Sequence, residues 1–428
     1  MTVSIITALF LLVSSYSLDF VTWIVALLAS IVLLWSRSTV LSLPTGLVRI
    51  LVAPALLLCL GLHGIYSNSL FDVGKDLWYF SGPVVYISFG YLVFERLGSW
   101  QRLVQPLVVI GAYSCLVTIV GVVANREQLL ATITVESYRR IAGLGTFLFV
   151  IPTVVLFLMR HVGLPTTGVT RLTMVRATTY ILSIIAVLST FSRTTMVCLA
   201  AGLVCTVNPR FTPRRVRNYT AFVLGAAVLL ALASNMLHSD KVGVLLDSFA
   251  QKTANTSSEV NVHSYETYKD INLNWRGFEA SRAAKTYAAF SDTEKLFGGG
   301  FGTTVDLGFA MKLGNTGESF EFVPLLHNGY MELLVKTGLL GLSLFIVFCI
   351  QIAFMALQEL RQPGKCAKLN GLLLLWTVFV FVLTQGAIAG IYNKGELAPN
   401  LFLLGATCAS VSLCDRYRLL RDEPTTSR

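Results

Sequence analysis

The chain has 428 residues, of which 54% are hydrophobic and 13% are charged, and its mean hydropathy is +0.69. Soluble domains carry about 25% charged residues, so the composition excludes an ordinary soluble protein and predicts an all-α polytopic membrane protein. The net charge of +10 lies mostly between apolar stretches, without a long Lys/Arg block and interleaved aromatics. It therefore indicates membrane topology and no nucleic-acid partner.

About twelve stretches are apolar and long enough, or nearly so, to cross the roughly 30 Å hydrocarbon layer of a bilayer. They lie near residues 3–17, 19–35, 46–66, 77–94, 103–123, 143–159, 176–191, 194–208, 219–237, 327–357, 369–391 and 398–414. The chain is thus predicted to divide into transmembrane helices 1–9, a large periplasmic loop with short helices, transmembrane helices 10–12 and a cytoplasmic tail. These parts occupy residues 1–237, 238–326, 327–414 and 415–428.

Lys and Arg gather in every second connection, for example at Arg96, Arg160, Arg215 and Lys365. The positive-inside rule places such connections in the cytoplasm. Both termini are then cytoplasmic, and the loop over residues 238–326 faces the periplasm or the cell exterior.

The second half of this loop has the pattern of an ordered segment that lies on the membrane surface. Aromatic residues alternate with charges through NWRGFEASRAAKTYAAF, which begins at Asn274, and this pattern predicts a helix. The following run, LFGGGFG, lacks the GK[ST] of a phosphate-binding loop. Its glycines therefore predict a tight turn.

The tenth span begins in a polar sequence at His327, and we expect it to continue as one helix without a break. Gly338 and Gly341 share a face with His327, which would let a neighbouring helix approach closely. Glu332 and Lys336 have the i,i+4 spacing of an ordinary ion pair on a helix.

Under this orientation, several basic groups face the outer boundary, where short connections should contain few of them. Guanidinium groups grip phosphate through paired donors, and imidazole titrates near neutrality and accepts a proton from a hydroxyl. Arginines and a histidine at the outer, apolar boundary of the membrane therefore suit the binding of a lipid-linked diphosphate, whose charged group lies at the interface while its lipid tail stays in the bilayer. The blander readings are interfacial anchors for the arginines and a capping role for the histidine. The residues concerned are Arg139, Arg140, Arg193, Arg276, Arg282 and His327.

Five short pieces of the chain resemble, in the same order, the O-antigen ligase and O-antigen polymerase superfamily of bacterial membrane glycosyltransferases. They are RIAGLG from Arg140, FSR ending at Arg193, NWRGFE around Arg276, LFGGGFG, and LLHNGYMELLVKTGLLGL around His327. The resemblance covers roughly residues 135–345, and the first four spans match only as hydrophobic helices.

The resemblance implies an inverting, metal-independent enzyme without a cofactor in the bacterial inner membrane. Its donor would be an undecaprenyl-diphosphate-linked oligosaccharide, its acceptor a glycan, and its active site would face the periplasm. The family's catalytic base maps to His327, and its diphosphate-binding arginines map to Arg140, Arg193 and Arg276. Further candidates are Arg282, which replaces Arg276 if the loop aligns differently, and Arg139, Asn328 and Tyr330.

Two enzymes share this chemistry in the assembly of O-antigen or exopolysaccharide. We expect the polymerase, which passes the growing glycan to the next lipid-linked repeat unit, because NWRGFE and LFGGGFGTTVDLG look like polymerase relatives. The alternative is a ligase, which passes finished glycan to the lipid A core. A chain-length regulator and a flippase are candidate partners. The alternative of another class is a transporter of polysaccharide or lipid-linked oligosaccharide, which the scarcity of charges within the spans disfavours.

Overall fold

The computed structural model describes residues 2–16, 19–36, 44–125, 147–165, 173–189, 192–205, 271, 274–312, 319–387, 390–392 and 397–422. The predicted span near residues 219–237, the first half of the large loop, and both Arg139 and Arg140 lie outside these residues.

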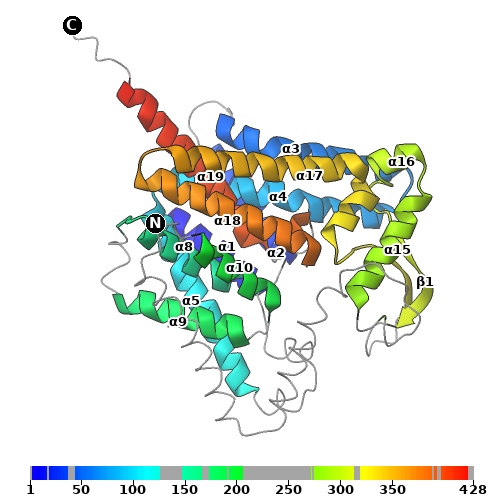
Figure 1. Ribbon diagram of the computed structural model, residues 1–428, viewed down its shortest axis with the longest axis horizontal. Coiled ribbons are helices and arrows are strands. Elements are labelled where there is room, and N and C mark those ends of the chain that lie inside the picture. The colour runs from blue at the N-terminus through cyan, green and yellow to red at the C-terminus, as the bar shows by residue number, and fades with distance from the viewer. Residues whose placement is uncertain are drawn as a thin grey trace.

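The described residues form a helical bundle with one small sheet (Figure 1). The helices are α1 (Thr2–Ser15), α2 (Asp19–Trp35), α3 (Thr45–Gly61), α4 (Leu70–Leu97), α5 (Trp100–Ala124), α8 (Val150–His161), α9 (Thr173–Ser189), α10 (Arg193–Val204), α15 (Trp275–Ala289), α16 (Asp292–Phe297), α17 (Gly329–Arg361), α18 (Lys365–Ala387) and α19 (Ala398–Asp422). The described residues also form three short 3-10 helices, η1 (Leu62–Tyr66), η2 (Phe147–Phe149) and η4 (Gly390–Tyr392). They contain two strands, β1 (Val305–Lys312) and β2 (Ser319–Val323).

Within the described part of the chain, 5 helices are long and apolar enough to cross a membrane. These are Thr45–Tyr66, Leu70–Leu97, Trp100–Ala124, Gly329–Arg361 and Lys365–Gly386. Shorter apolar helices cover Thr2–Ser15, Asp19–Trp35, Val150–His161 and Thr194–Val204. The prediction of a helical membrane protein is confirmed, whereas the count of about twelve spans stays a prediction.

The centre of the bundle is α4, which packs along α19 and against α2 and α3. Glycines bring α4 and α19 together, because a Cβ at Gly90 would lie 1.9 Å from the carbonyl oxygen of Phe402 and one at Gly405 would lie 2.0 Å from that of Ile87. Small residues of this kind let helix backbones approach closely in lipid. Close glycine-mediated packing in the described residues thus includes α4 and α19, which the sequence analysis did not single out, as well as Gly338 of α17, whose Cβ position lies 2.4 Å from the carbonyl oxygen of Leu296 in α16.

One end of the bundle carries a compact layer, which we call the platform: α15, α16, the glycine turn over residues 298–302, and the β1–β2 hairpin (Figure 1). It confirms the expected order in the second half of the large loop and the helix through NWRGFEASRAAKTYAAF. The loop contains the predicted short helices, α15 and α16, and also a β-hairpin that the sequence analysis did not predict. Val305 of β1 pairs with Val323 of β2 in an antiparallel hairpin, whose Val305 and Leu307 pack on Phe278 of α15.

The hairpin has a physical cause that is visible in the sequence. In VDLGFAMK, Val305 and Leu307 are buried, whereas Asp306 and Gly308, which alternate with them along the strand, are exposed. Alternation with a period of two is the signature of a strand with one buried face. The short strand is bounded by turn residues, so its signal spans too few positions to stand out beside the stronger helical pattern of α15.

The glycine run forms a tight turn, as predicted. Gly298, Gly300 and Gly302 have φ values of 81°, 83° and 86°, which are in the left-handed region that residues with a Cβ rarely adopt. The turn reaches into the bundle, where the N–H of Phe301 donates to the carbonyl oxygen of Gly61 over 2.7 Å. The turn therefore joins the platform to the end of α3.

The prediction of an unbroken helix after His327 was wrong. Gly338 has φ 65° and ψ −164°, which interrupts the helical path inside α17. The N–H groups of Gly299 and Gly300 donate to the carbonyls of Val335 and Lys336 over 2.9 and 3.1 Å, so the glycine turn satisfies acceptors beside the break. Irregular backbone among transmembrane helices is tolerated where other protein groups satisfy it in this way.

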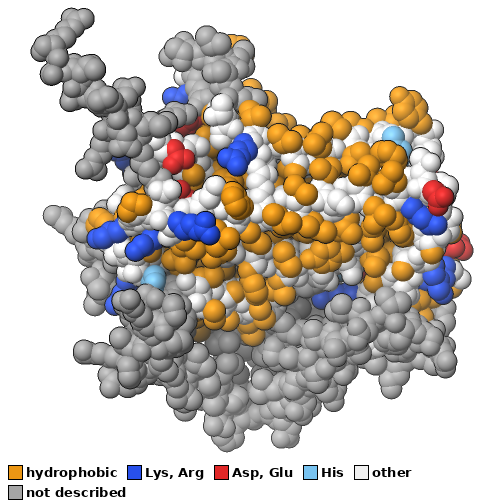
Figure 2. Space-filling model, turned by 45° about the horizontal axis from the view of Figure 1, so that its top comes forward, with side chains coloured by type: hydrophobic (Ala, Val, Ile, Leu, Met, Phe, Trp, Pro, Cys, Tyr) orange, Lys and Arg blue, Asp and Glu red, His pale blue; other side chains and the backbone are white. Residues whose placement is uncertain are grey.

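The break separates α17 into two parts with different surroundings. Residues 329–337 lie against the platform, and residues 339–361 continue as the long helix of the bundle (Figure 1). At 1.5 Å per residue the second part is roughly 34 Å long, which is enough to cross a bilayer by itself. The polar start of α17 therefore packs against the platform, whereas the apolar remainder of the helix is the membrane span. Figure 2 shows a broad hydrophobic surface between charged groups that concentrate toward the two ends.

The glycine turn yields a test of this junction. A Cβ at Gly300 would lie 2.4 Å from the Cα of Gly64, at a φ of 83°, so we expect Gly300→Ala to lower the free energy of unfolding by about 1–3 kcal/mol or more. Gly74→Ala is the control, because nothing lies within 4 Å of its Cβ position. Thermal unfolding in detergent should show a lower Tm for Gly300→Ala and an unchanged or slightly higher one for Gly74→Ala. Equal Tm values for both variants and the wild type would contradict the close approach.

Candidate functional site

His327 is bound by Glu279, a residue that the sequence analysis did not single out. Oε2 of Glu279 lies 2.8 Å from Nδ1 of His327 and accepts the backbone N–H of His327 over 3.1 Å. The carboxylate belongs to the middle of α15, and its side chain is 2% exposed, whereas the imidazole is 47% exposed. A buried carboxylate thus holds a histidine whose ring reaches the surface of the platform.

This contact fixes the chemistry of the ring. In the neutral imidazole, a proton on Nδ1 donates to the carboxylate, which leaves Nε2 as the acceptor; this tautomer follows from the hydrogen-bond partner. Because the same oxygen also binds the backbone of His327, rotation of the ring away from Glu279 would break the Nδ1 contact. The arrangement suits a general base at Nε2 whose positive charge, once it has taken a proton, is stabilised by the carboxylate.

Two further candidates have structural roles beside this histidine. Asn328 is the N-cap of α17, and its Oδ1 accepts the N–H groups of Tyr330 and Met331 over 3.1 and 3.3 Å. The hydroxyl of Tyr330 donates to the carbonyl of Val382 in α18 over 2.9 Å. These contacts begin the short helix after His327 and attach it to α18.

The two candidate arginines of α15 lie in different surroundings. Arg276 stands three residues before Glu279, on the same face of the helix and one turn away. Arg282 is attached to the hairpin, where its Nε donates to the carbonyl of Asp306 over 2.8 Å and its Nη2 lies 3.7 Å from Oδ2 of that residue. The structure thus engages Arg282 in the platform and brings Arg276 near the residue that holds His327.

Arg193 begins α10 directly after its N-cap, Ser192, whose hydroxyl oxygen accepts the N–H of Thr195. The side chain of Arg193 is not among those described, and Arg139 and Arg140 lie outside the described residues. The predicted meeting of Arg140, Arg193, Arg276 and His327 therefore stays a prediction. Within the described residues, the observed juxtaposition is that of His327 with the helix that carries Arg276.

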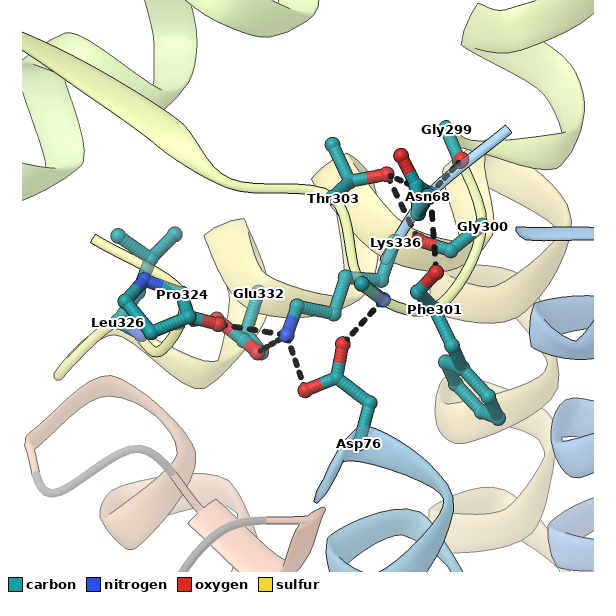
Figure 3. A network of polar contacts seen from close by, with 11 residues as sticks. Asn68, Asp76, Gly299, Gly300, Phe301, Thr303, Pro324, Leu326, Glu332 and Lys336 are labelled. Carbon is teal, nitrogen blue, oxygen red and sulfur yellow. Dashed lines mark hydrogen bonds and ion pairs between the residues drawn. The ribbon is translucent and has the colours of Figure 1, made fainter. Parts of the chain in front are cut away.

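A buried ion cluster lies beneath the platform (Figure 3). Nζ of Lys336 is 2.8 Å from Oε1 of Glu332, which confirms the predicted i,i+4 pair, and 2.5 Å from Oδ1 of Asp76 in α4. All three side chains are at most 3% exposed. The sequence predicts neither the third member of the cluster nor the burial of its three side chains.

In the described part of the chain, no group of three or more His, Cys, Asp or Glu could hold a metal ion. None of the eight cysteines takes part in a disulfide. The described chemistry is therefore that of a carboxylate-bound imidazole, of guanidinium groups and of a buried ammonium.

An apolar helical bundle with an ordered platform, and a carboxylate-bound histidine on that platform, define a multi-pass membrane protein with a site at one end of its bundle. Residues 178–346 match the model of the family described as O-antigen ligase. This match supports the O-antigen ligase and O-antigen polymerase superfamily of membrane glycosyltransferase-like enzymes for residues 178–346, in agreement with the resemblance seen in the sequence. The matched residues include Arg193, Arg276, Glu279 and His327 but not Asp76. No curated protein matches the chain.

The tautomer of His327 can be tested directly. We expect ¹⁵N NMR of histidine-labelled protein, at a pH where the ring is neutral, to show Nδ1 protonated and Nε2 unprotonated. His327→Gln assigns the signal among the 5 histidines of the chain. Glu279→Ala should remove this preference, whereas Glu321→Ala, which changes an exposed carboxylate of the same platform, should keep it. A wild-type ring protonated at Nε2 would contradict the proposed orientation.

Proposed function

We propose that the protein is a polysaccharide polymerase that transfers undecaprenyl-diphosphate-linked glycan to a sugar hydroxyl of another lipid-linked repeat unit. The observation that carries this proposal is the contact of 2.8 Å between His327 and Glu279, on the helix that also begins with Arg276. It supports the proposal because the proposed base, His327, then lies beside the helix that carries Arg276, which is proposed to bind the diphosphate, in a chain whose residues 178–346 match the O-antigen ligase family. The transfer inverts the anomeric centre and uses no metal.

The reaction follows from the orientation of the ring. Nε2 of His327 takes the proton of the acceptor hydroxyl as its oxygen attacks the anomeric carbon of the donor. The new bond is between that carbon and the acceptor oxygen, and the bond that breaks joins the carbon to the diphosphate, which leaves with the electron pair. Glu279 stabilises the imidazolium, which then releases its proton to water.

The charge that develops on the leaving diphosphate needs fixed cations. Guanidinium groups supply paired donors and stay charged at any working pH. Arg276 is the described side chain that fits this role, and Arg140 and Arg193 are proposed to complete the diphosphate site with it. Donors that are aimed at developing charge in a site partly shielded from water are among the largest contributions to catalysis.

The orientation in the membrane follows from the two ends of the bundle. Asp76 lies near the start of α4 and binds the platform, so Arg96 at the other end of this helix lies far from it. Lys365 at the start of α18 likewise contacts the connection after α8, through the carbonyl of Gly163 over 2.9 Å. The positive-inside rule then puts this basic end and both termini in the cytoplasm, and the platform on the periplasmic side of a bacterial inner membrane.

The second candidate is a ligase that passes finished glycan to the lipid A core, and it is favoured by the description of the matched family as O-antigen ligase. Both enzymes would use the same donor site and the same base, and they differ in the acceptor. A flippase that supplies the donor and a chain-length regulator are proposed partners of the polymerase.

A transporter remains the alternative of another class, because ionised side chains and interrupted helices also occur at the substrate sites of transporters. The cluster of Asp76, Glu332 and Lys336 differs from such a site in one respect. Its side chains are almost completely buried and bind one another and the backbone, so they do not line a path through the bundle. Release of undecaprenyl diphosphate by purified protein would support the enzyme, and its absence with a complete donor and acceptor would favour the transporter.

The base has a direct test. We expect His327→Ala to lower the rate of glycan transfer in reconstituted membranes by roughly 100- to 10,000-fold, the usual contribution of a general base. Binding of the lipid-linked donor should persist, because the ring acts on the acceptor. His161→Ala is the control, since His161 ends α8 outside the platform. Normal product formation by His327→Ala would remove the base assignment.

The two arginines of α15 form a matched pair for the donor site. We expect Arg276→Ala to reduce donor affinity by roughly 10- to 100-fold, which corresponds to the loss of a hydrogen bond to a charged group. Arg282→Ala should affect donor affinity less, because Arg282 binds Asp306 in the hairpin. Donor titrations of both variants give the comparison. A larger loss of affinity with Arg282→Ala would assign the diphosphate to Arg282.

The product that accumulates in a deletion strain separates the two enzymes. Single lipid-linked repeat units should accumulate if the protein is a polymerase, because no chain can grow. Long lipid-linked chains would instead identify a ligase.

A further inference from the structure

The buried ammonium of Lys336 donates hydrogen bonds to Asp76 and Pro324 and forms an ion pair with Glu332. An ammonium group has three N–H donors, and three acceptors surround this one: Oδ1 of Asp76 at 2.5 Å, the carbonyl oxygen of Pro324 at 2.6 Å and Oε1 of Glu332 at 2.8 Å. The acceptors come from α4, from the segment before His327 and from α17. The position of Nζ is therefore determined from three directions (Figure 3).

Three backbone groups of the segment from Pro324 to His327 bind buried charged side chains. Lys336 binds the carbonyl of Pro324, Oε2 of Glu332 accepts the N–H of Leu326 over 2.9 Å, and Glu279 accepts the N–H of His327 over 3.1 Å. The first two contacts belong to the ion cluster and the third belongs to the proposed site. The cluster and the site thus share one continuous piece of backbone.

Asp76 connects this piece to the rest of the bundle. Its Oδ1 binds Lys336, and its Oδ2 accepts the N–H of Gly302 over 2.6 Å. One carboxylate of α4 therefore accepts hydrogen bonds both from the glycine turn of the platform and from Lys336, which in turn binds the carbonyl of Pro324. Asp76 lies outside residues 178–346, so this support comes from a part of the chain that the family model does not cover.

We propose that Asp76, Glu332 and Lys336 act together as positioning residues that set the place of the His327 imidazole relative to the membrane bundle. This proposal rests on the proposed function of His327 as the base. The residues touch no reacting atom; they fix the backbone over residues 324–326, and through it the direction in which His327 enters its contact with Glu279. Loss of Lys336 would leave two buried carboxylates without a counter-charge. Loss of either carboxylate would remove one acceptor of the ammonium together with one hydrogen bond to the backbone, through Gly302 for Asp76 and Leu326 for Glu332, so we expect the segment to shift.

The test compares Asp76→Asn with a matched control. Glu359→Gln changes another buried carboxylate of α17, which accepts a hydrogen bond from Asn370 over 3.3 Å near the opposite end of the helix. In reconstituted membranes, we expect Asp76→Asn to lower kcat by roughly 10- to 100-fold, the effect of a displacement of about 1 Å. The KM for the lipid-linked donor should change little, and Glu359→Gln should leave both constants near the wild-type values.

A second readout does not depend on turnover. The ¹⁵N signal of the Nδ1–H of His327 should shift or broaden in Asp76→Asn and stay unchanged in Glu359→Gln. A displaced His327 signal in Asp76→Asn together with an unchanged rate of glycan transfer would support the positioning role but contradict the assignment of His327 as the base. This outcome distinguishes a failure of the proposed function from a failure of the positioning proposal. An undisturbed signal together with wild-type kcat in folded Asp76→Asn would overturn the positioning role.

If Asp76→Asn does not fold, the variant Glu332→Asp tests the positioning role in its place. It keeps the charge beside Lys336 and shortens the reach to the N–H of Leu326 by one methylene. We expect a reduced kcat and a displaced His327 signal, with thermal stability close to that of the wild type. Wild-type values of both would overturn the proposal, whereas a parallel loss with Lys336→Gln would support it.

Discussion

The enclosure of one ammonium group by two carboxylates and a carbonyl determines how the platform is attached to the bundle. An ionised side chain without a partner is very costly in a dry interior, and loss of one partner from a buried pair typically costs 3–5 kcal/mol. Lys336 is therefore stable in its place only while Asp76 and Glu332 remain beside it. Because each of these partners also binds backbone of the platform or of the segment before His327, the same contacts hold the candidate site in place.

The broken helix and the glycine turn are two halves of one junction. Gly338 interrupts α17, and a Cβ on it would lie 2.4 Å from the carbonyl oxygen of Leu296. A Cβ on Gly298 would in turn lie 2.4 Å from the backbone of Lys336. Residues without a side chain are needed on both sides, because here backbone meets backbone and the donors of the turn replace those that the helix loses. The break lets the start of α17 leave the span and carry His327 onto the platform.

Sequence patterns predicted the parts of the fold that have a local cause. The period of α15, the apolar spans, the glycine turn and the i,i+4 pair of α17 each arise from residues that are close in the chain. The partners that define the site are distant: Glu279 and His327 are 48 residues apart, and Asp76 and Lys336 are 260 apart. A pairing of this kind leaves no periodic signal, and Glu279 resembles any polar residue of an amphipathic helix. Asp76 lies just before the predicted span near residues 77–94 and beside Lys75, so the sequence does not distinguish it from an ordinary charged residue at a helix end.

The measurement closest to the central claim is a structure of the protein in lipid with a non-hydrolysable undecaprenyl-diphosphate glycan. We expect the diphosphate to lie within hydrogen-bond reach of Arg276 and Arg193, with the anomeric carbon on the Nε2 side of His327. Glu279 should still bind Nδ1, and Lys336 should still bind Asp76. A diphosphate bound at the opposite end of the bundle, or a His327 ring turned away from the sugar, would contradict the assignment of this platform as the site of glycan transfer.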